Sequence, residues 1–197
     1  IREEYLLTGP LEPTNRPYAI AKIAGIEMCW SYNRQYGTRY LCAMPTNLYG
    51  PGDNYDLQMS HVLPALMRKF HEGKLRNERT VTVWGTGKPR REFLHSDDMA
   101  EACIHLLENS AAVQSRLGPE RAPLVNVGCG EDQTIAELAA EVRQAVGSSA
   151  EIVYDRAKPD GTLQKLLDIA LVRSFGWQPR IGLAEGLRLT YESFVNK

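Results

Sequence analysis

The chain is 197 residues long, with 43% hydrophobic and 24% charged residues, the composition of a globular protein that can bury a core of ordinary size. Its 23 basic and 24 acidic residues give a net charge of −1, which argues against nucleic acids and acidic membranes as partners. No apolar run approaches the roughly 20 residues that cross a bilayer, and no signal peptide is recognisable. We therefore expect a cytoplasmic globular protein.

The cysteines are widely spaced and form neither a CxxC pair nor a metal-ligand pattern. They are Cys29, Cys42, Cys103 and Cys129. Such scattered cysteines are typical of reduced, partly buried thiols in a reducing compartment. We therefore expect neither a disulfide nor a metal site.

The N-terminal part of the chain is predicted to be a loop followed by a long helix. Residues 1–16 contain Gly-Pro and Pro breakers, which indicate loop. Residues 17–37 are predicted to be helical, because Pro17 suits a first turn and Gly37 can end a helix. The helix carries an apolar stripe of Ile20, Ile23, Ala24, Met28 and Tyr32. A core or a partner subunit could cover this stripe.

The rest of the chain alternates between strand and helix signals. Strands are predicted over 40–44, 80–84, 91–95, 124–127 and 151–154, and helices over 61–71, 97–108, 135–147, 169–175 and 183–195. Ser96 is the expected N-cap of its helix, and Thr134 with Glu137 forms a capping box. Residues 47–60 are predicted to be a long polar loop. The alternation predicts an α/β fold with a parallel sheet.

One pair on the first helix has a chemical use. Tyr18 and Lys22 are four residues apart, so they share one helix face. A lysine ammonium beside a phenol favours the phenolate, which prepares the tyrosine to give a proton to a carbonyl oxygen during ketone reduction. The same spacing also occurs on ordinary helix surfaces.

The sequence contains no glycine-rich fingerprint between a strand and a helix, which a dinucleotide pyrophosphate needs. It also opens at Ile1 with a polar stretch rather than a methionine. We therefore expect this chain to be the C-terminal part of a longer enzyme, and inactive alone.

Several motifs together resemble the extended short-chain dehydrogenase/reductase family. They are YAIAK at 18–22, PTNLYGP at 45–51, SHVLPAL at 60–66 and KPDGT at 158–162. Within that family the combination is similar to enzymes that epimerise C3 and C5 of GDP-4-keto-6-deoxy-D-mannose and then reduce C4 with NADPH. The resemblance covers essentially the whole chain.

The resemblance implies a division of the chain. Residues 1–50 would end a Rossmann-like NADP-binding domain, and residues 51–197 would mainly form a smaller mixed α/β domain that binds the GDP-sugar. Residues 92–108 and 123–128 would return to the Rossmann sheet. The helix over 17–37 would form half of a homodimer's helical bundle.

The resemblance also assigns catalytic roles. Tyr18 would be the acid of the reduction, and Lys22 would also bind the nicotinamide ribose. His61 would be the acid of the epimerisation, since an imidazole titrates near about pH 6.5 and can hold or release a proton; a histidine at a helix start can equally be a solvated surface residue. The family's catalytic serine and cysteine match no residue of this chain.

The resemblance implies two sets of binding residues. The cofactor would contact Tyr18, Lys22, Pro45, Thr46, Asn47, Leu48 and His61. The GDP-sugar would contact Lys69, Trp84, Arg91, Asp160 and Lys165. Charged donors suit a diphosphate, although Lys69 stands where some members have an arginine and lacks the planar guanidinium fork.

Two alternatives stay open. The chain could act on another nucleotide sugar as an epimerase or 4,6-dehydratase with the same Tyr18 and Lys22. It could also be a non-catalytic nucleotide-sugar-binding fragment, which would bind GDP without NADPH or turnover.

Overall fold

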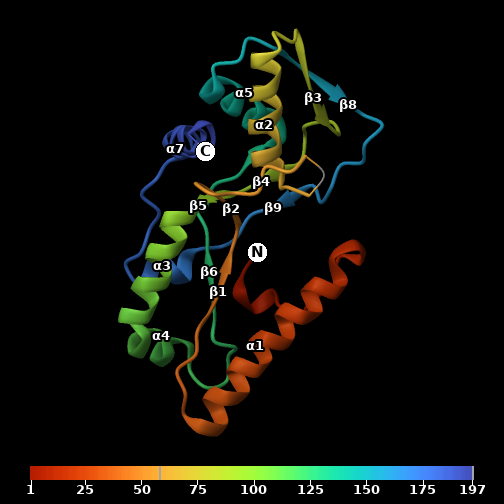
Figure 1. Ribbon diagram of the computed structural model, residues 1–197. Helices are drawn as coiled ribbons and strands as arrows, with labels where there is room; N and C mark the ends of the chain where they lie inside the picture. Colours follow the sequence, from red (N-terminus) through yellow and green to blue (C-terminus); the bar gives the residue numbers. More distant parts are fainter. Residues whose placement is uncertain (58, 197) are drawn as a thin grey trace.

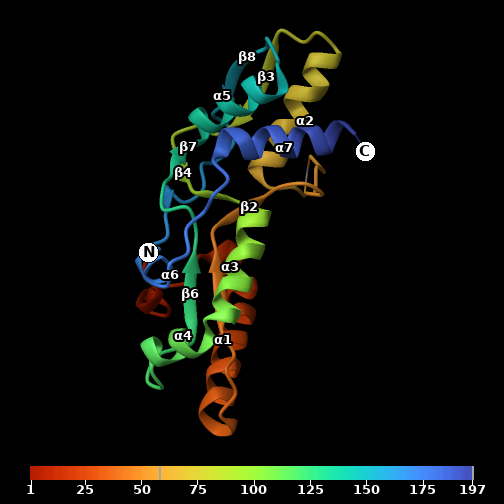
Figure 2. The same cartoon turned by 90° about the vertical axis from the view of Figure 1, so that its left-hand side faces the viewer.

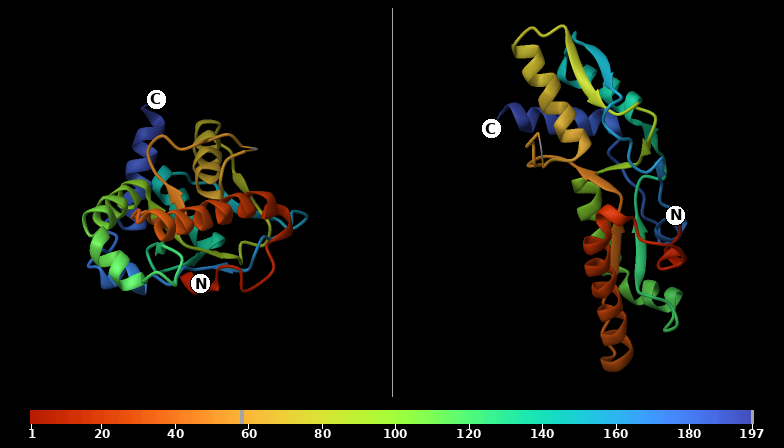
Figure 3. Two further views of the ribbon diagram at one scale, coloured as in Figure 1. Left: turned by 90° about the horizontal axis from the view of Figure 1, so that it is seen from below. Right: turned by 90° about the vertical axis from the view of Figure 1, so that its right-hand side faces the viewer.

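The computed structural model describes residues 1–57 and 59–196, so Gln58, in the predicted loop, and Lys197 lie outside the described residues. Figure 1 shows an elongated α/β molecule with α2, β3, α5, β8 and α7 at one end and α1, β1, β6, α3 and α4 at the other. Figure 2 and the right-hand view of Figure 3 show the same division from other sides. The predicted fold class is confirmed. No helix among the described residues is long and apolar enough to cross a membrane.

The long first helix has the boundaries that its sequence signals predict. After two single turns of 3-10 helix, η1 (Glu3–Tyr5) and η2 (Pro13–Asn15), α1 spans Arg16–Tyr36. It ends at Gly37, whose φ of +65° is the left-handed conformation that glycine adopts without steric cost.

The predicted apolar stripe of α1 is not its buried face. Ile20, Met28 and Tyr32 are exposed, whereas Ile26 is buried and Ile23 is half-buried. The described part of the chain therefore leaves this stripe uncovered.

The lower end is built on a parallel strand pair. Strand β1 (Cys42–Pro45) pairs in parallel with β6 (Leu124–Val127), in the register Cys42 to Leu124. Three helices pack there: α3 (Ser96–Glu108), α4 (Ser110–Leu117) and α6 (Ala170–Ser174). Their shared core includes Ala102, Leu106, Val113, Val125, Val127 and Val172.

The upper end has a separate core around a second parallel pair. Strand β3 (Thr80–Trp84) pairs with β8 (Glu151–Asp155). Helices α2 (Val62–Leu75), α5 (Ile135–Val146) and α7 (Leu183–Val195) pack together beside it. The core includes Leu63, Met67, Phe70, Val83, Leu138, Val142 and Leu187.

Short strands join the two ends. Strand β2 (Asn47–Tyr49) pairs in parallel with β5 (Phe93–His95). Strand β4 (Arg90–Arg91) lies between β7 (Gln133–Thr134), which is antiparallel to it, and β9 (Gln164–Lys165), which is parallel to it.

Several sequence predictions of local structure are wrong. Residues 47–49 of the predicted loop form strand β2, and the predicted strand 91–95 is split into β4 and β5 at Glu92. Ser96 is the first residue of α3, and the N-cap of that helix is His95. The Nδ1 atom of His95 accepts a hydrogen bond from the Asp97 amide. Helix α4 and strands β7 and β9 were not predicted.

The capping box and the thiols agree with prediction. The Thr134 hydroxyl accepts the Glu137 amide, and the Glu137 carboxylate accepts the Thr134 amide at 2.7 Å. All four cysteines are partly buried and outside any disulfide.

A buried carboxylate ties the upper helix α7 to the lower helix α3. Asp98 is buried, and its two oxygens accept the amides of Arg180 and Ile181, each at 3.0 Å. These bonds fix the segment that leads into α7.

We predict that Asp98→Ala lowers the free energy of unfolding by about 1–3 kcal/mol, because two amides lose their acceptor. Asp97→Ala, at the exposed neighbouring position, should cost less than about 1 kcal/mol through the helix dipole. Urea titration of both variants measures the difference, and equal losses would contradict the role given to Asp98.

Candidate functional site

Tyr18 and Lys22 share one face of α1, as their spacing predicts. The Lys22 ammonium lies 5.4 Å from the centre of the Tyr18 ring. Tyr18 is 60% exposed, so its hydroxyl is open to a ligand. The positive charge stands where it can stabilise the phenolate left after proton donation.

The predicted cofactor-contacting segment follows directly from β1. The amide of Thr46 donates to the Val127 carbonyl at 3.0 Å, which places this segment at the carboxyl ends of both β1 and β6. Open α/β sheets bind their ligands outside these ends. Pro45, Thr46, Asn47 and Leu48 therefore lie at an edge suited to a ligand.

A buried carboxylate that the sequence analysis missed holds this edge in place. Glu92 has 0% exposure, and its side chain accepts the amides of Gly130 at 2.7 Å and Leu167 at 3.0 Å. Its main-chain carbonyl accepts the Thr46 hydroxyl at 3.2 Å and the Asn47 side-chain amide at 2.8 Å. The available sequence signal was an acidic residue inside a strand otherwise bound for the core.

His61 is the N-cap residue of α2 and is exposed. Its carbonyl accepts the Ala65 amide at 3.1 Å, and its exposed ring lies at the start of the helix. The ring is therefore available for proton transfer to a bound molecule.

Trp84 and Lys69 form a cationic aromatic surface at the end of β3. Trp84 is 56% exposed, and the Lys69 ammonium lies 4.9 Å from its ring centre. Lys69 also donates to the Thr82 carbonyl at 3.1 Å, and burial lowers its pKa. The Lys158 ammonium lies 5.2 Å from the same ring.

Arg91 and Lys165 stand side by side on neighbouring strands. They are register partners in β4 and β9, so their side chains project to the same face. Arg91 Nη1 donates to the carbonyls of Arg90 at 2.7 Å and Thr162 at 2.6 Å, which orients the guanidinium.

Asp160 is engaged within the protein. Its carboxylate accepts the Thr86 amide at 2.8 Å and the Thr86 hydroxyl at 2.6 Å, and these bonds lower its pKa. Asp160 thereby fastens the loop after β8 to the turn after β3. A direct contact with substrate stays a prediction.

The turn before α1 is capped by an acidic side chain. The Glu12 carboxylate caps the turn before α1, and its pKa is lowered mainly by the Thr14 hydroxyl and in smaller part by the charge of Lys165. The capped turn leads directly into α1, which carries Tyr18 and Lys22.

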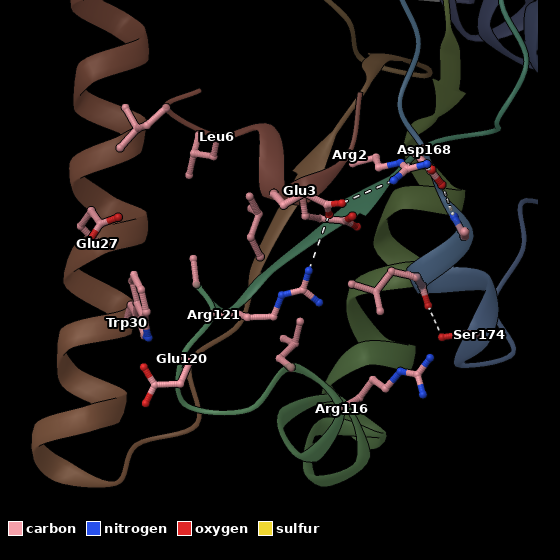
Figure 4. Close-up of a pocket in the computed structure, with 17 residues that line it drawn as sticks. Arg2, Glu3, Leu6, Glu27, Trp30, Arg116, Glu120, Arg121, Asp168 and Ser174 are labelled. Atoms are coloured by element: carbon pink, nitrogen blue, oxygen red, sulfur yellow. Dashed lines mark hydrogen bonds and ion pairs between the residues drawn. The ribbon is translucent and has the colours of Figure 1, made fainter. Parts of the chain in front are cut away.

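A separate cavity lies away from these residues. It has a volume of about 580 Å³ and lies between α1, α4 and the N-terminal turn. Figure 4 shows Arg2 beside Asp168, and Arg121 directed toward the acidic side chains of the first turn. Its lining contains none of the predicted site residues.

Comparison with known proteins gives a consistent result. The model of the NAD dependent epimerase/dehydratase family matches residues 1–128. The GDP-L-fucose synthase of Escherichia coli (strain K12) is 52% identical over 193 residues, which are 98% of this chain and 60% of that protein. The probable GDP-L-fucose synthase 1 of Oryza sativa is 51% identical over 99% of this chain and 57% of its own length.

Solved structures agree. A GDP-6-OMe-4-keto-L-xylo-heptose reductase from C. jejuni superposes with a TM-score of 0.91 and 37% identity, over 100% of this chain and 65% of that one. A GDP-L-fucose synthetase from Naegleria fowleri superposes with a TM-score of 0.86 and 26% identity, over 100% of this chain and 60% of that one. The chain thus spans about 60% of the length of these relatives. It belongs to the NAD dependent epimerase/dehydratase family.

Proposed function

We propose that this chain is the C-terminal, substrate-binding part of a GDP-L-fucose synthase, which converts GDP-4-keto-6-deoxy-D-mannose into GDP-L-fucose with NADPH. The observation that carries the proposal is the pairing of Lys22 with Tyr18, 5.4 Å from ammonium to ring centre, in a chain that also aligns Arg91 with Lys165 on neighbouring strands. The identity of 52% to the E. coli enzyme supports the choice of sugar. Because the chain spans about 60% of such relatives, the activity is that of a longer polypeptide.

The residues present fit one end of the cofactor. Tyr18 and Lys22 are exposed, and residues 45–48 lie at the carboxyl ends of β1 and β6, which suits the nicotinamide and its ribose. The chain has no glycine-rich turn for the pyrophosphate, which falls to the remainder of the polypeptide. Bound NADPH supplies the hydride for the reduction.

In the reduction Tyr18 gives its proton to the oxygen of the C4 ketone. Lys22 stabilises the phenolate that remains and holds the ribose. In the epimerisation His61 returns protons to C3 and C5 after a base outside this chain removes them. Residues 45–48 are held in position by Glu92.

The diphosphate is bound by cations from two places in the structure. Arg91 and Lys165 supply charge on one face of β4 and β9, and Trp84 with Lys69 supplies an aromatic surface and a further cation. Asp160 shapes the loop between them.

We also propose that the exposed stripe of α1 packs against a second copy in a homodimer. Residues 1–50 with 92–108 and 123–128 then belong to the nucleotide-binding domain, and most of the remainder to the GDP-sugar domain. The shared core of β6, α3 and α4 supports this division. Partly buried free thiols suit a cytoplasmic location.

A second candidate is the 4-reduction of a different GDP-sugar without epimerisation. The TM-score of 0.91 to a C. jejuni GDP-heptose reductase favours it. Proton exchange at C3 and C5 separates the two functions.

We predict that Tyr18→Phe in the full-length protein lowers 4-reduction by about 10²–10⁴-fold, because the ketone oxygen loses its proton donor. Exchange of the C3 and C5 hydrogens with deuterated water should continue. NADPH oxidation and NMR of the sugar measure the two steps. Tyr36→Phe, at an exposed tyrosine of the same helix outside the stripe, is the control, and an equal loss in both variants would contradict the assignment.

We predict the opposite pattern for His61→Gln. Deuterium incorporation at C3 and C5 should fall by about 10²-fold or more, because the ring no longer returns a proton. The same NMR assay measures it. Unchanged incorporation would remove His61 from the epimerisation, and absence of incorporation even in the unaltered protein would favour the simple reductase.

A further inference from the structure

Trp84 is flanked by two cations from different parts of the chain. Lys69 comes from α2, and Lys158 comes from the loop after β8. Their ammonium groups lie 4.9 Å and 5.2 Å from the centre of the indole. The structure thus concentrates positive charge on one exposed ring.

Lys158 is held in this place by its loop. Its amide donates to the Asp155 carbonyl at 3.2 Å, and two residues later Asp160 is fastened to Thr86 by two hydrogen bonds. Gly85 lies so close beneath Asp160 that a Cβ there would overlap the carboxylate. The loop is therefore pinned on both sides of Lys158.

The acidic side chain nearest in the sheet, that of Asp155 opposite Trp84, accepts the Ala157 amide. Among the described residues no ion pair includes Lys69, Lys158 or Arg91, although ion pairs occur at other arginines of the chain. Asp160, in the same loop, is bound to Thr86. Two like charges on one ring repel each other, so this arrangement is stabilised when an anion lies between or beside them.

The far end of the same loop leads to Arg91. The Thr162 carbonyl accepts Arg91 Nη1, so one short loop runs from the Trp84 cations to the Arg91 guanidinium. A diphosphate carries negative charge on each of its phosphoryl groups, and a lysine ammonium binds phosphate as a point charge. The loop thus lies beside cations that can bind the phosphoryl groups of a diphosphate.

We infer that Lys158 is a further substrate-binding residue, which with Lys69 binds the diphosphate of the nucleotide sugar at Trp84. The inference rests on the proposed function, since it names a contact of the same substrate. Lys158 touches substrate rather than acting through another residue.

The test compares Lys158→Gln with Arg156→Gln, an exposed cation two residues earlier in the same loop. Titration calorimetry measures binding of GDP, UDP, inorganic pyrophosphate and guanosine to the chain. Lys158→Gln should weaken the binding of GDP and of pyrophosphate about tenfold, which is the effect of losing one charge-assisted hydrogen bond. The affinity for guanosine should stay unchanged. Arg156→Gln should change each by less than about twofold, and Lys158→Arg should restore GDP binding to within about threefold.

The outcomes separate the inference from the function. If unaltered protein binds GDP and Lys158→Gln behaves like Arg156→Gln, the inference falls and the proposed function stands. If UDP binds more tightly than GDP and Lys158→Gln weakens both, the inference stands and the GDP assignment falls. If Lys158→Gln shifts the unfolding midpoint in the absence of nucleotide, and weakens guanosine binding as much as GDP binding, then Lys158 is a structural residue and the inference is overturned.

Discussion

The arrangement of the site depends on the buried carboxylate of Glu92. An unpaired charge in a protein interior costs several kcal/mol, so its position is set by the donors that satisfy it. Those donors are the amides of Gly130, after β6, and Leu167, after β9. Because the main-chain carbonyl of Glu92 also accepts hydrogen bonds from the side chains of Thr46 and Asn47, three segments distant in sequence converge on this residue.

This convergence explains how two separate cores form one site. One core carries β1 and β6, and the other carries α2 and β3. Glu92 lies between β4 and β5, next to Arg91, so the ends of β1 and β6 are fixed beside the strand that carries Arg91. The predicted cofactor-contacting segment and Arg91 are thus positioned by the same buried residue.

The sequence predicts what local signals determine. Pro17 and Gly37 bound α1, Thr134 and Glu137 begin α5, and the spacing of Tyr18 and Lys22 puts both on one face. Strands β2 and β9 escape prediction because two or three residues become a strand only through a partner distant in sequence. The grouping of Lys69, Trp84 and Lys158 is likewise a product of the β3 and β8 pairing, and the buried role of Glu92 depends on amides far along the chain.

Hydrogen exchange at the Gly130 and Leu167 amides tests most directly whether Glu92 holds the two parts together. In the unaltered chain both amides should exchange as slowly as the core amides of Val125 and Val127, and in Glu92→Gln both should exchange faster while the core amides stay slow. Rapid exchange of both amides in the unaltered chain, at the rate of exposed loops, would contradict the account.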